Sequence, residues 1–248
     1  MRSNIMLLLL TIVITLYSAA CDFSSDPCYS SKDPDSRIKA CTEVIGSFFY
    51  QQDVAYNNRC AGYFDKKQFD MALADCSKAI ELNNRYESPY IYRGSVYFLK
   101  GEYDKALQDY NKVLELNPGA ASAYVGRGIT YEKKGLPDQA LLDYNRAIEL
   151  QPNYALVWMN RGNVFSGRNQ FDQALADYNK AITMDPNYAV TYYNLAQLYA
   201  KKNDLNETCT WLERYAKFGN VDYESLRHDK EFDRFRNTPC YKKILSGK

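Results

Sequence analysis

The sequence predicts an all-α chain built as a solenoid, a stack of helix-turn-helix units without one central core. Three observations predict this fold class. A block of sequence returns four times, aromatic and small residues follow a helical spacing inside each block, and a proline closes three of the blocks. Repetition at intervals of about 20 to 50 residues is typical of units that bury their apolar faces only by stacking on their neighbours.

The repetition is regular, because one alanine in each block stands 34 residues after its counterpart in the preceding block. These residues are Ala72, Ala106, Ala140 and Ala174, and Pro118, Pro152 and Pro186 keep the same step. We therefore expect full repeats at residues 53–86, 87–120, 121–154 and 155–188, followed by a degenerate fifth repeat at 189–222.

Each repeat is expected to contain two helices, as the third repeat illustrates. Residues spaced i, i+3, i+4 and i+7 share one face of a helix. The first helix has such a face in Tyr124, Arg127, Gly128 and Tyr131, and the second has one in Ala140, Asp143, Tyr144 and Ala147. The small residues on these faces let the two helices approach closely, while the aromatic rings fill the space towards neighbouring repeats.

The pattern resembles the tetratricopeptide repeat, whose signature sets an aromatic residue, a glycine and a second aromatic residue ahead of the alanine. The matching triplets are Tyr90, Gly94 and Tyr97; Tyr124, Gly128 and Tyr131; and Trp158, Gly162 and Phe165. The resemblance covers roughly two thirds of the chain. It implies a right-handed superhelix in which the first helices of successive repeats line a concave groove.

Capping helices are expected at both ends, because the exposed ends of a repeat array need polar-faced caps. Residues 21–52 form the N-terminal segment, in which Ser36 can cap a helix. This segment resembles the opening of many exported bacterial tetratricopeptide proteins of the Asn-Arg-Gly type, an echo of which is Asn160-Arg161-Gly162. Residues 223–248 resemble the segment that closes some tetratricopeptide arrays.

Residues 1–20 are predicted to form a secretory signal peptide, with Arg2, an apolar run from Met6 to Leu16, and a small-residue cleavage site ending at Ala20. The alternative is an uncleaved membrane anchor, although the apolar run is short for spanning a bilayer. We expect a periplasmic or envelope-associated protein, or a secreted one. Cys21 stands where a bacterial lipoprotein carries its acylated cysteine, although Ser18 occupies a place where a larger aliphatic residue is usual.

The chain has seven cysteines and no Cys-x-x-Cys spacing, which favours disulfides over metal sites in an exported protein. Antiparallel packing pairs positions whose offsets within a repeat sum to a constant. Cys60 is the eighth and Cys76 the twenty-fourth residue of the first repeat, so we expect these two to bond. The nearest remaining partners are Cys28 with Cys41 and Cys209 with Cys240. Buried free thiols are the alternative.

A second regularity is an arginine at the seventh and an aspartate at the twenty-third position of four repeats. The pairs are Arg59 with Asp75, Arg93 with Asp109, Arg127 with Asp143, and Arg161 with Asp177. In the fifth repeat both places turn apolar together, as Leu195 and Trp211, which suggests contact. We expect partly buried, bidentate ion pairs. Two independent solvated faces are the alternative.

The resemblance also implies which residues line the groove, through fixed positions of each first helix. These residues are Asn57, Asn58, Ala61, Phe64, Ile91, Tyr92, Ser95, Phe98, Val125, Ile129, Glu132, Met159, Asn160, Asn163, Ser166, Tyr193, Asn194 and Gln197. They are mainly apolar residues and amides, which suit an extended peptide. None of the groove's second, fifth or sixth positions is basic, whereas the chaperone-binding subfamily uses Lys and Arg at several of these places, so a chaperone adaptor is disfavoured.

Composition bounds the function further. The net charge is +1 without a basic run, which disfavours nucleic acid, and the lone His228 lies in a charged segment. With no catalytic or metal-binding motif and no expected cofactor, we predict a non-catalytic, exported scaffold that binds a protein or peptide. It would meet a membrane only through a lipid on Cys21. The alternatives are a secreted factor that engages host proteins, a homo-oligomeric structural subunit, and a redox thiol at Cys60 or Cys76.

Overall fold

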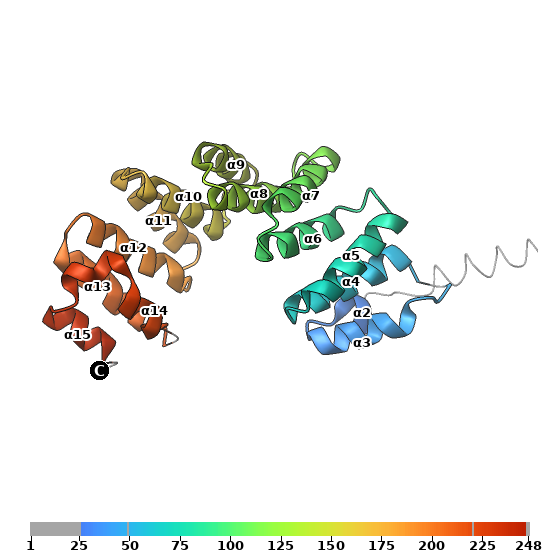
Figure 1. Cartoon of the computed structure of the whole chain (residues 1–248), viewed down its shortest axis with the longest axis horizontal. Helices are drawn as coiled ribbons and strands as arrows, with labels where there is room; N and C mark the ends of the chain where they lie inside the picture. The colour runs from blue at the N-terminus through green and yellow to red at the C-terminus, as the bar shows by residue number, and fades with distance from the viewer. Residues whose placement is uncertain (1–25, 49, 220, 247–248) are drawn as a thin grey trace, which may run out of the picture. The chain divides into compact units, whose positions relative to one another are not determined.

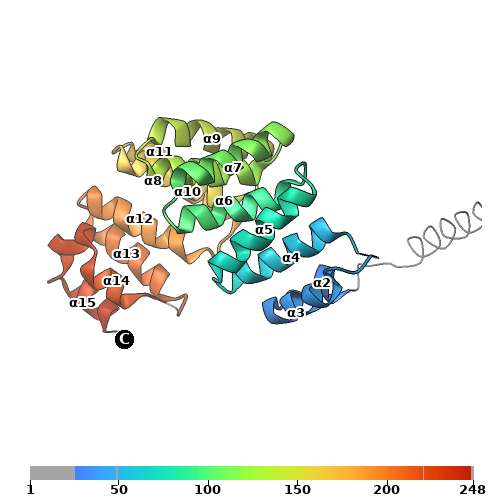
Figure 2. The same ribbon diagram turned by 45° about the vertical axis from the view of Figure 1, so that its right-hand side comes forward.

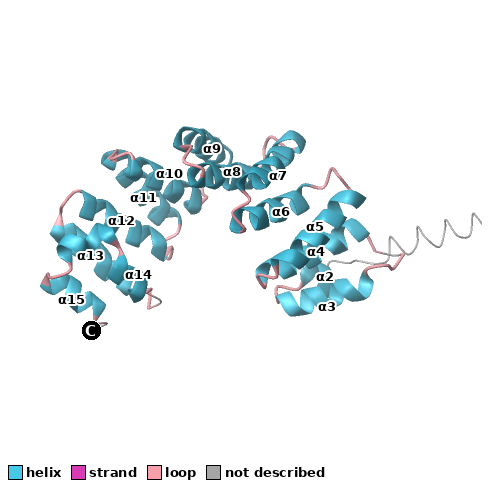
Figure 3. Ribbon diagram, viewed as in Figure 1, coloured by secondary structure: helices cyan, strands magenta, loops and turns pink. Residues whose placement is uncertain are grey.

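The computed structural model describes residues 26–48, 50–219 and 221–246, and every regular element in these residues is helical (Figure 3). By its internal contacts the chain divides into two compact units, Met1–Pro118 and Gly119–Lys248. We call them the N-terminal unit and the C-terminal unit and describe each by itself. No helix in the described ranges is long and apolar enough to cross a membrane.

The N-terminal unit holds two short capping helices and two helix pairs (Figure 1). Its helices are α2 (Pro27–Ser30), α3 (Pro34–Val44), α4 (Gln52–Asp65), α5 (Phe69–Leu82), α6 (Glu87–Leu99) and α7 (Tyr103–Leu116). Asp33 begins α3, because its side chain accepts a hydrogen bond from the backbone N–H of Ser36. The expected cap at Ser36 is therefore wrong by one turn, and Ser36 lies inside the helix.

The C-terminal unit holds three helix pairs and a compact end segment (Figure 2). Its helices are α8 (Ala121–Lys133), α9 (Pro137–Leu150), α10 (Ala155–Gly167), α11 (Phe171–Met184), α12 (Ala189–Lys201), α13 (Leu205–Ala216), α14 (Tyr223–His228), the 3-10 helix η2 (Lys230–Phe235) and α15 (Pro239–Leu245). The end segment packs Phe232, Tyr241 and Ile244 against Ala196 and Leu212, which covers the last helix pair with an apolar core of its own.

The turn between the two helices of each repeat has one conformation throughout. Its fifteenth residue adopts a left-handed backbone, with φ between 57° and 77°, in Lys67, Gly101, Gly135, Asn169 and Asn203. Glycine and asparagine adopt this conformation readily, whereas a lysine does so at a cost. The identical turn keeps the second helix of each repeat in the same register against the first.

In the four full repeats the contact between the two helices takes two forms. In the second, third and fourth repeats, a tyrosine ring at position 24 packs directly over the glycine at position 8. A Cβ added to Gly128 would lie 2.7 Å from Cε1 of Tyr144, so only glycine fits there without a shift. In the first repeat the same two positions hold Cys60 and Cys76, both fully buried.

Candidate functional site

The predicted arginine and aspartate residues meet in all four repeats as bidentate pairs. In the third repeat Nε and Nη2 of Arg127 donate to the two carboxylate oxygens of Asp143 at 2.8 and 2.7 Å. The other three pairs have the same geometry, with N–O distances between 2.6 and 2.9 Å. The aspartates are buried and the arginines half-buried. The charges therefore lie inside the array and are not part of a ligand-facing surface.

Each of these arginines also contacts its surroundings beyond the aspartate. Its guanidinium lies between two aromatic rings of its own helix, as in Arg161, 4.9 Å from the ring centre of Trp158 and 5.7 Å from that of Phe165. In the second and fourth repeats the third nitrogen reaches the preceding repeat, where Nη1 of Arg93 donates to Oγ of Ser77 at 3.2 Å and Nη1 of Arg161 donates to Oδ1 of Asn145 at 2.6 Å. These two arginines thus tie neighbouring repeats together in addition to their own helix pairs.

The structure places the six described cysteines in three pairs at disulfide bonding distance. These pairs are Cys28 with Cys41, Cys60 with Cys76, and Cys209 with Cys240. Their Cα–Cα distances of 4.6, 5.5 and 6.1 Å suit a disulfide. Cys21 and the predicted signal peptide lie outside the described residues.

In the N-terminal unit, three of the predicted groove residues line one pocket. Asn58 and Ala61 of α4 and Tyr92 of α6 form one wall, and residues 28–32 with Arg37 form the other. Nε of Arg37 donates to the carbonyl of Ser31 at 2.9 Å, which holds the N-terminal segment beside α4. The capping segment, to which sequence analysis assigned no groove residue, therefore completes the hollow beside α4 and α6.

The pocket of the N-terminal unit is polar with aromatic edges. The ring of Phe64 lies 5.7 Å from that of Tyr92, and burial raises the pKa of Tyr92, which stays a neutral phenol. Arg37 is neutralised by Asp65 at 3.0 Å, whereas Lys32 is exposed and has no counter-ion in the described part of the chain. The site therefore offers hydrogen-bond donors, an aromatic face and one uncompensated positive charge.

Several predicted groove residues bond within the chain instead of facing a ligand. The hydroxyl of Tyr110 lies 3.1 Å from Oγ of Ser95, that of Tyr144 donates to Glu132, and that of Tyr178 donates to Oδ1 of Asn163 at 2.8 Å. Burial raises the pKa of Glu132 above its ordinary value. Ser95, Glu132 and Asn163 are therefore the polar partners of the position-24 tyrosines.

Two further amides join neighbouring first helices. Nδ2 of Asn194 donates to Oδ1 of Asn163 at 2.8 Å, and Nδ2 of Asn57 donates to the hydroxyl of Tyr86 at 3.1 Å. Asn57 and Asn160 are buried, each with one amide atom that has no partner in the described structure. These amides are buried between helices. The expectation that they contact a ligand directly is therefore wrong in this structure.

The remaining predicted groove residues divide into core and surface. Val125, Met159 and Ser166 are buried, at 3%, 5% and 6% exposure, and unlike Ala61 they line neither of the two described pockets, so their assignment to a ligand-facing surface is corrected. Ile91, Phe98 and Ile129 are half-buried and stay available for contact.

The end segment fills the last part of the predicted groove. Asp229, which precedes η2, accepts hydrogen bonds from the hydroxyl of Tyr193 and from Nε2 of Gln197, the latter at 2.7 Å. The ring of Phe232 stacks edge-on against Tyr193 at 5.9 Å. The expectation that Tyr193 and Gln197 face a ligand is therefore wrong in this structure, because the chain's own cap occupies them.

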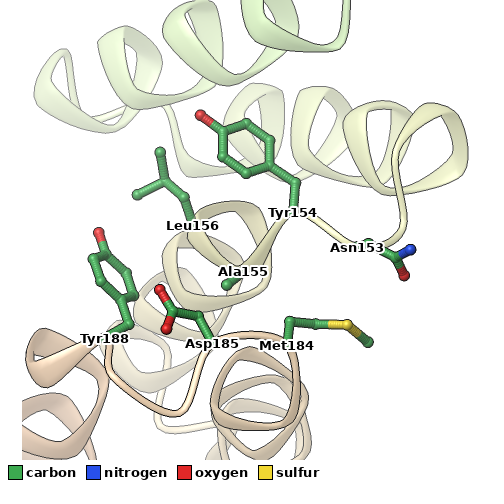
Figure 4. A pocket seen from close by; sticks show the side chains of 7 residues that line it. All are labelled: Asn153, Tyr154, Ala155, Leu156, Met184, Asp185 and Tyr188. Carbon is green, nitrogen blue, oxygen red and sulfur yellow. The ribbon is translucent and has the colours of Figure 1, made fainter.

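A second pocket lies in the C-terminal unit, where sequence analysis named no residue. It is lined by Asn153, Tyr154, Ala155, Leu156, Met184, Asp185 and Tyr188. Figure 4 shows Tyr154 and Leu156 in the upper part of the view, with Tyr188, Asp185 and Met184 below them. The tyrosines occupy position 34 of successive repeats, just ahead of each first helix. Comparison of that position along the array would have found them.

The described residues hold no group of three or more His, Cys, Asp or Glu side chains that could bind a metal ion. His228 is exposed, and its Nε2 lies 2.9 Å from the carboxylate of Glu224 on the same short helix. This arrangement is an ordinary surface contact.

Comparison with known families agrees with the architecture. The TPR repeat model matches residues 94–135 and 162–203, and tetratricopeptide repeat models match residues 54–86, 121–154 and 143–176. Together the matches span 54–86 and 94–203, more than half of the chain. No curated protein sequence matches the chain significantly.

Solved structures show the same fold at low sequence identity. PilW, a type IV pilus biogenesis factor, is 17% identical with a TM-score of 0.70, and the match covers 79% of this chain and 91% of PilW. A tetratricopeptide repeat protein from Parabacteroides merdae is 19% identical with a TM-score of 0.64, over 93% of this chain and 98% of that protein.

YrrB, a tetratricopeptide repeat protein with an unusual peptide-binding site, is 24% identical with a TM-score of 0.56, over 77% of this chain and 97% of its own. Identities this low support the fold alone. With the repeat matches, the glycine and tyrosine packing and the repeated turn, they establish that this chain belongs to the tetratricopeptide repeat family.

Proposed function

We propose that this protein is an exported, non-catalytic scaffold that binds an extended segment of another polypeptide on the face formed by its first helices. The observation that carries the proposal is the pocket of the N-terminal unit, where Asn58, Ala61 and Tyr92 line one hollow. The sequence also predicts all three as groove residues.

The chemistry of this pocket suits a peptide backbone. Nδ2 of Asn58 has no partner in the described structure and can donate to a carbonyl, while Oδ1 already accepts from Asn57 at 3.2 Å. The ring of Tyr92 offers an apolar contact beside it. Alternating donors and apolar surface are what extended peptides meet in recognition sites. YrrB, which shares the fold, carries a peptide-binding site.

The cysteine pairs support export. All six described cysteines stand in pairs at bonding distance, and disulfides persist in oxidising compartments such as the bacterial periplasm. Together with the predicted signal peptide, this favours a periplasmic or envelope-associated protein of the Asn-Arg-Gly type. Cys21 is the one cysteine left for a lipid anchor. Alkylation of the unreduced protein tests the pairing, since a thiol that reacts at Cys60 or Cys76 would revive the redox alternative.

Site-specific crosslinking tests the binding face. A photo-reactive residue in place of Tyr92 is expected to capture polypeptide in native envelopes, and the same residue in place of the exposed Lys78 on α5 is expected to capture far less. Adding Asn58→Arg should block the pocket and abolish capture, whereas Asn179→Arg, the same change on an exposed second helix, should not. Equal capture at both places, or capture that survives Asn58→Arg, would refute this face.

The alternatives separate in two further measurements. A structural subunit that holds its own copy must change mass with concentration, so a constant monomeric mass by light scattering excludes it. A secreted factor that engages host proteins would be found in the culture medium and not with the envelope. Both measurements use the full chain.

A further inference from the structure

The pocket of the C-terminal unit stands where two other repeats carry an internal hydrogen bond. In the first repeat, Nδ2 of Asn83 at position 31 donates to the carboxylate of Asp53 at position 1, at 2.9 Å. In the second, Nδ2 of Asn117 donates to the carboxylate of Glu87 at 3.0 Å. An acid at the start of the first helix is thus paired with an amide at the end of the second.

The fourth repeat breaks this rule in a specific way. Its position 1 is Ala155 and its position 31 is Asp185, so the acid stands at the second member of the pair and the first member has no polar side chain to meet it. Both residues line the pocket. The hollow therefore lies beside position 1, where the first two repeats have an acidic side chain and the fourth has an alanine.

Asp185 lacks a cation. Its Oδ1 accepts a hydrogen bond from the backbone N–H of Asn187 at 3.0 Å, and within the described ranges no Lys, Arg or His lies at ion-pair distance. Asp185 is also the C-terminal cap of α11, where the helix dipole adds partial negative charge. The carboxylate and the helix end therefore both favour a positive group in the pocket.

Two tyrosines supply the walls that a cation prefers. Tyr154 and Tyr188 both line the hollow, with Leu156 drawn between them in Figure 4, and neither hydroxyl has a partner in the part of the chain that the structure describes. Burial, with Tyr154 and Asp185 nearby, raises the pKa of Tyr188, so its ring stays neutral. Aromatic faces attract ammonium and guanidinium groups, as the protein's own Arg161 against Trp158 illustrates.

We propose that the pocket formed by Tyr154, Ala155, Leu156, Asp185 and Tyr188 binds the side chain of a lysine or arginine of the bound polypeptide. The inference rests on the proposed function and adds a charge preference to it. The third repeat lacks the same combination, because it has Gln151 in place of the aspartate and Ala120 in place of the first tyrosine. The fourth repeat is thus the place in the array built for a basic side chain.

Two small probes test the proposal without knowledge of the partner. N-acetyl-lysine methylamide and N-acetyl-norleucine methylamide share their carbon chain and differ in the ammonium group. We expect the lysine probe to shift the NMR signals of the Met184 methyl group and of the Tyr154 and Tyr188 rings saturably in the full chain. It should bind about fivefold more tightly than the norleucine probe, as expected for a cation on half-buried aromatic rings beside an exposed carboxylate.

Variants locate the effect. Asp185→Asn should remove the difference between the probes, whereas Asp172→Asn, which removes the same charge from an exposed site on α11, should preserve it. Ala155→Asn should place an amide beside Asp185, as the first two repeats do, and so abolish binding of the lysine probe without loss of thermal stability. Equal binding of both probes, or no binding of either, overturns the proposal.

The outcomes separate this inference from the proposed function. If the crosslinker at Tyr92 captures polypeptide but the lysine probe does not bind, the cation pocket alone is wrong. If the probe binds as expected and capture survives Asn58→Arg, the binding face in the N-terminal unit is wrong and the cation pocket stands.

Discussion

The first repeat and the three that follow differ in the side chains that join their two helices. At positions 8 and 24, the first repeat has Cys60 and Cys76 at bonding distance, whereas the others have a glycine beneath a tyrosine ring. The hydroxyl of each tyrosine reaches a polar side chain on the first helix, namely Ser95, Glu132 or Asn163. In the first repeat the matching places hold Ala61 and Phe64.

This difference teaches that the four positions behave as a set. A buried tyrosine hydroxyl needs a partner, and the first repeat has none to offer, so an apolar cross-link suits it better. The fifth repeat, with Ala196 and Leu212, solves the problem without polar atoms. Polarity at positions 9 and 12 therefore follows from the tyrosine of the same repeat and is not by itself a sign of ligand binding.

The largest expected effect concerns the ion pair that both kinds of repeat share. Arg127→Leu should destabilise the chain by about 3–5 kcal/mol in urea unfolding, because it leaves the buried carboxylate of Asp143 without its cation. Adding Asp143→Leu should recover much of this loss, since the fifth repeat holds Leu195 and Trp211 at these places.

The exposed Arg146, which contacts Glu149 at 2.7 Å, provides the control for the ion pair. Arg146→Leu should leave the unfolding midpoint unchanged, because a solvated pair contributes little. Strictly additive costs of the two single substitutions at Arg127 and Asp143 would contradict a coupled pair.

The next prediction exchanges the two solutions. Cys60→Ala with Cys76→Ala should cost about 3 kcal/mol, the value expected for a disulfide that closes a loop of this length. Cys60→Gly with Cys76→Tyr should recover part of that loss. Adding Ala61→Ser should recover about 1 kcal/mol more by supplying the hydroxyl partner that Ser95 supplies in the second repeat.

Urea unfolding of the oxidised variants measures all three steps of this exchange. If the glycine and tyrosine variant is no more stable than the double alanine variant, the two solutions are not equivalent. If Ala61→Ser adds nothing, the hydroxyl partner is not what separates the first repeat from the others.

Glycine substitutions sharpen the comparison within the later repeats. Gly128→Ala should cost about 1–3 kcal/mol, because its Cβ would stand 2.7 Å from the ring of Tyr144 and overpack the contact. Gly94→Ala should cost less, because a Cβ added to Gly94 would lie 3.1 Å from the nearest ring atom of Tyr110.

Gly167→Ala is the matched control, because a Cβ there meets nothing within 4 Å. It should stabilise the chain by up to about 1 kcal/mol through the better helix propensity of alanine. Equal costs at Gly128 and Gly167 would show that the close contact with tyrosine does not select glycine.

Much of the internal packing could be predicted from the sequence, because a residue's position within its repeat determines which residue of the facing helix it meets. This offset rule predicts that Arg127 lies opposite Asp143 and Cys60 opposite Cys76, and both are contacts within a repeat. The binding surface was harder to predict from the sequence. Glu132 and Asn163 stand at groove positions, but they bind the hydroxyls of Tyr144 and Tyr178.

Contacts with residues outside the numbered repeats could not be predicted in this way. Asp229 belongs to the end segment, so nothing in the repeat pattern indicated that it would take Tyr193 and Gln197. The pocket at Asp185 exists because Ala155 has no polar side chain to pair with that carboxylate. Only the hydrogen-bonded pair of Asp53 and Asn83 at the same positions of the first repeat reveals this difference.

The smallest expected effect is a pH dependence of stability in the third repeat, where the partner of the buried tyrosine is a titratable carboxyl group. Burial raises the pKa of Glu132 above its ordinary value of 4.5. Below that value the carboxyl group is protonated in the folded and the unfolded chain alike. As the pH rises, the unfolded chain releases its proton first, so the folded state holds more protons and the free energy of unfolding falls.

Glu132→Gln removes this titration while its amide oxygen still accepts from Tyr144. The variant should therefore gain stability over the natural chain as the pH rises from about 4.5 to 7, with little difference below that range. Glu149→Gln removes the same charge from an exposed site and controls for net charge. Urea unfolding across this range measures the gain. A gain that shrinks with rising pH would mean that Glu132 is stabilised as an anion, and that the hydrogen bond from Tyr144, not burial, dominates its pKa.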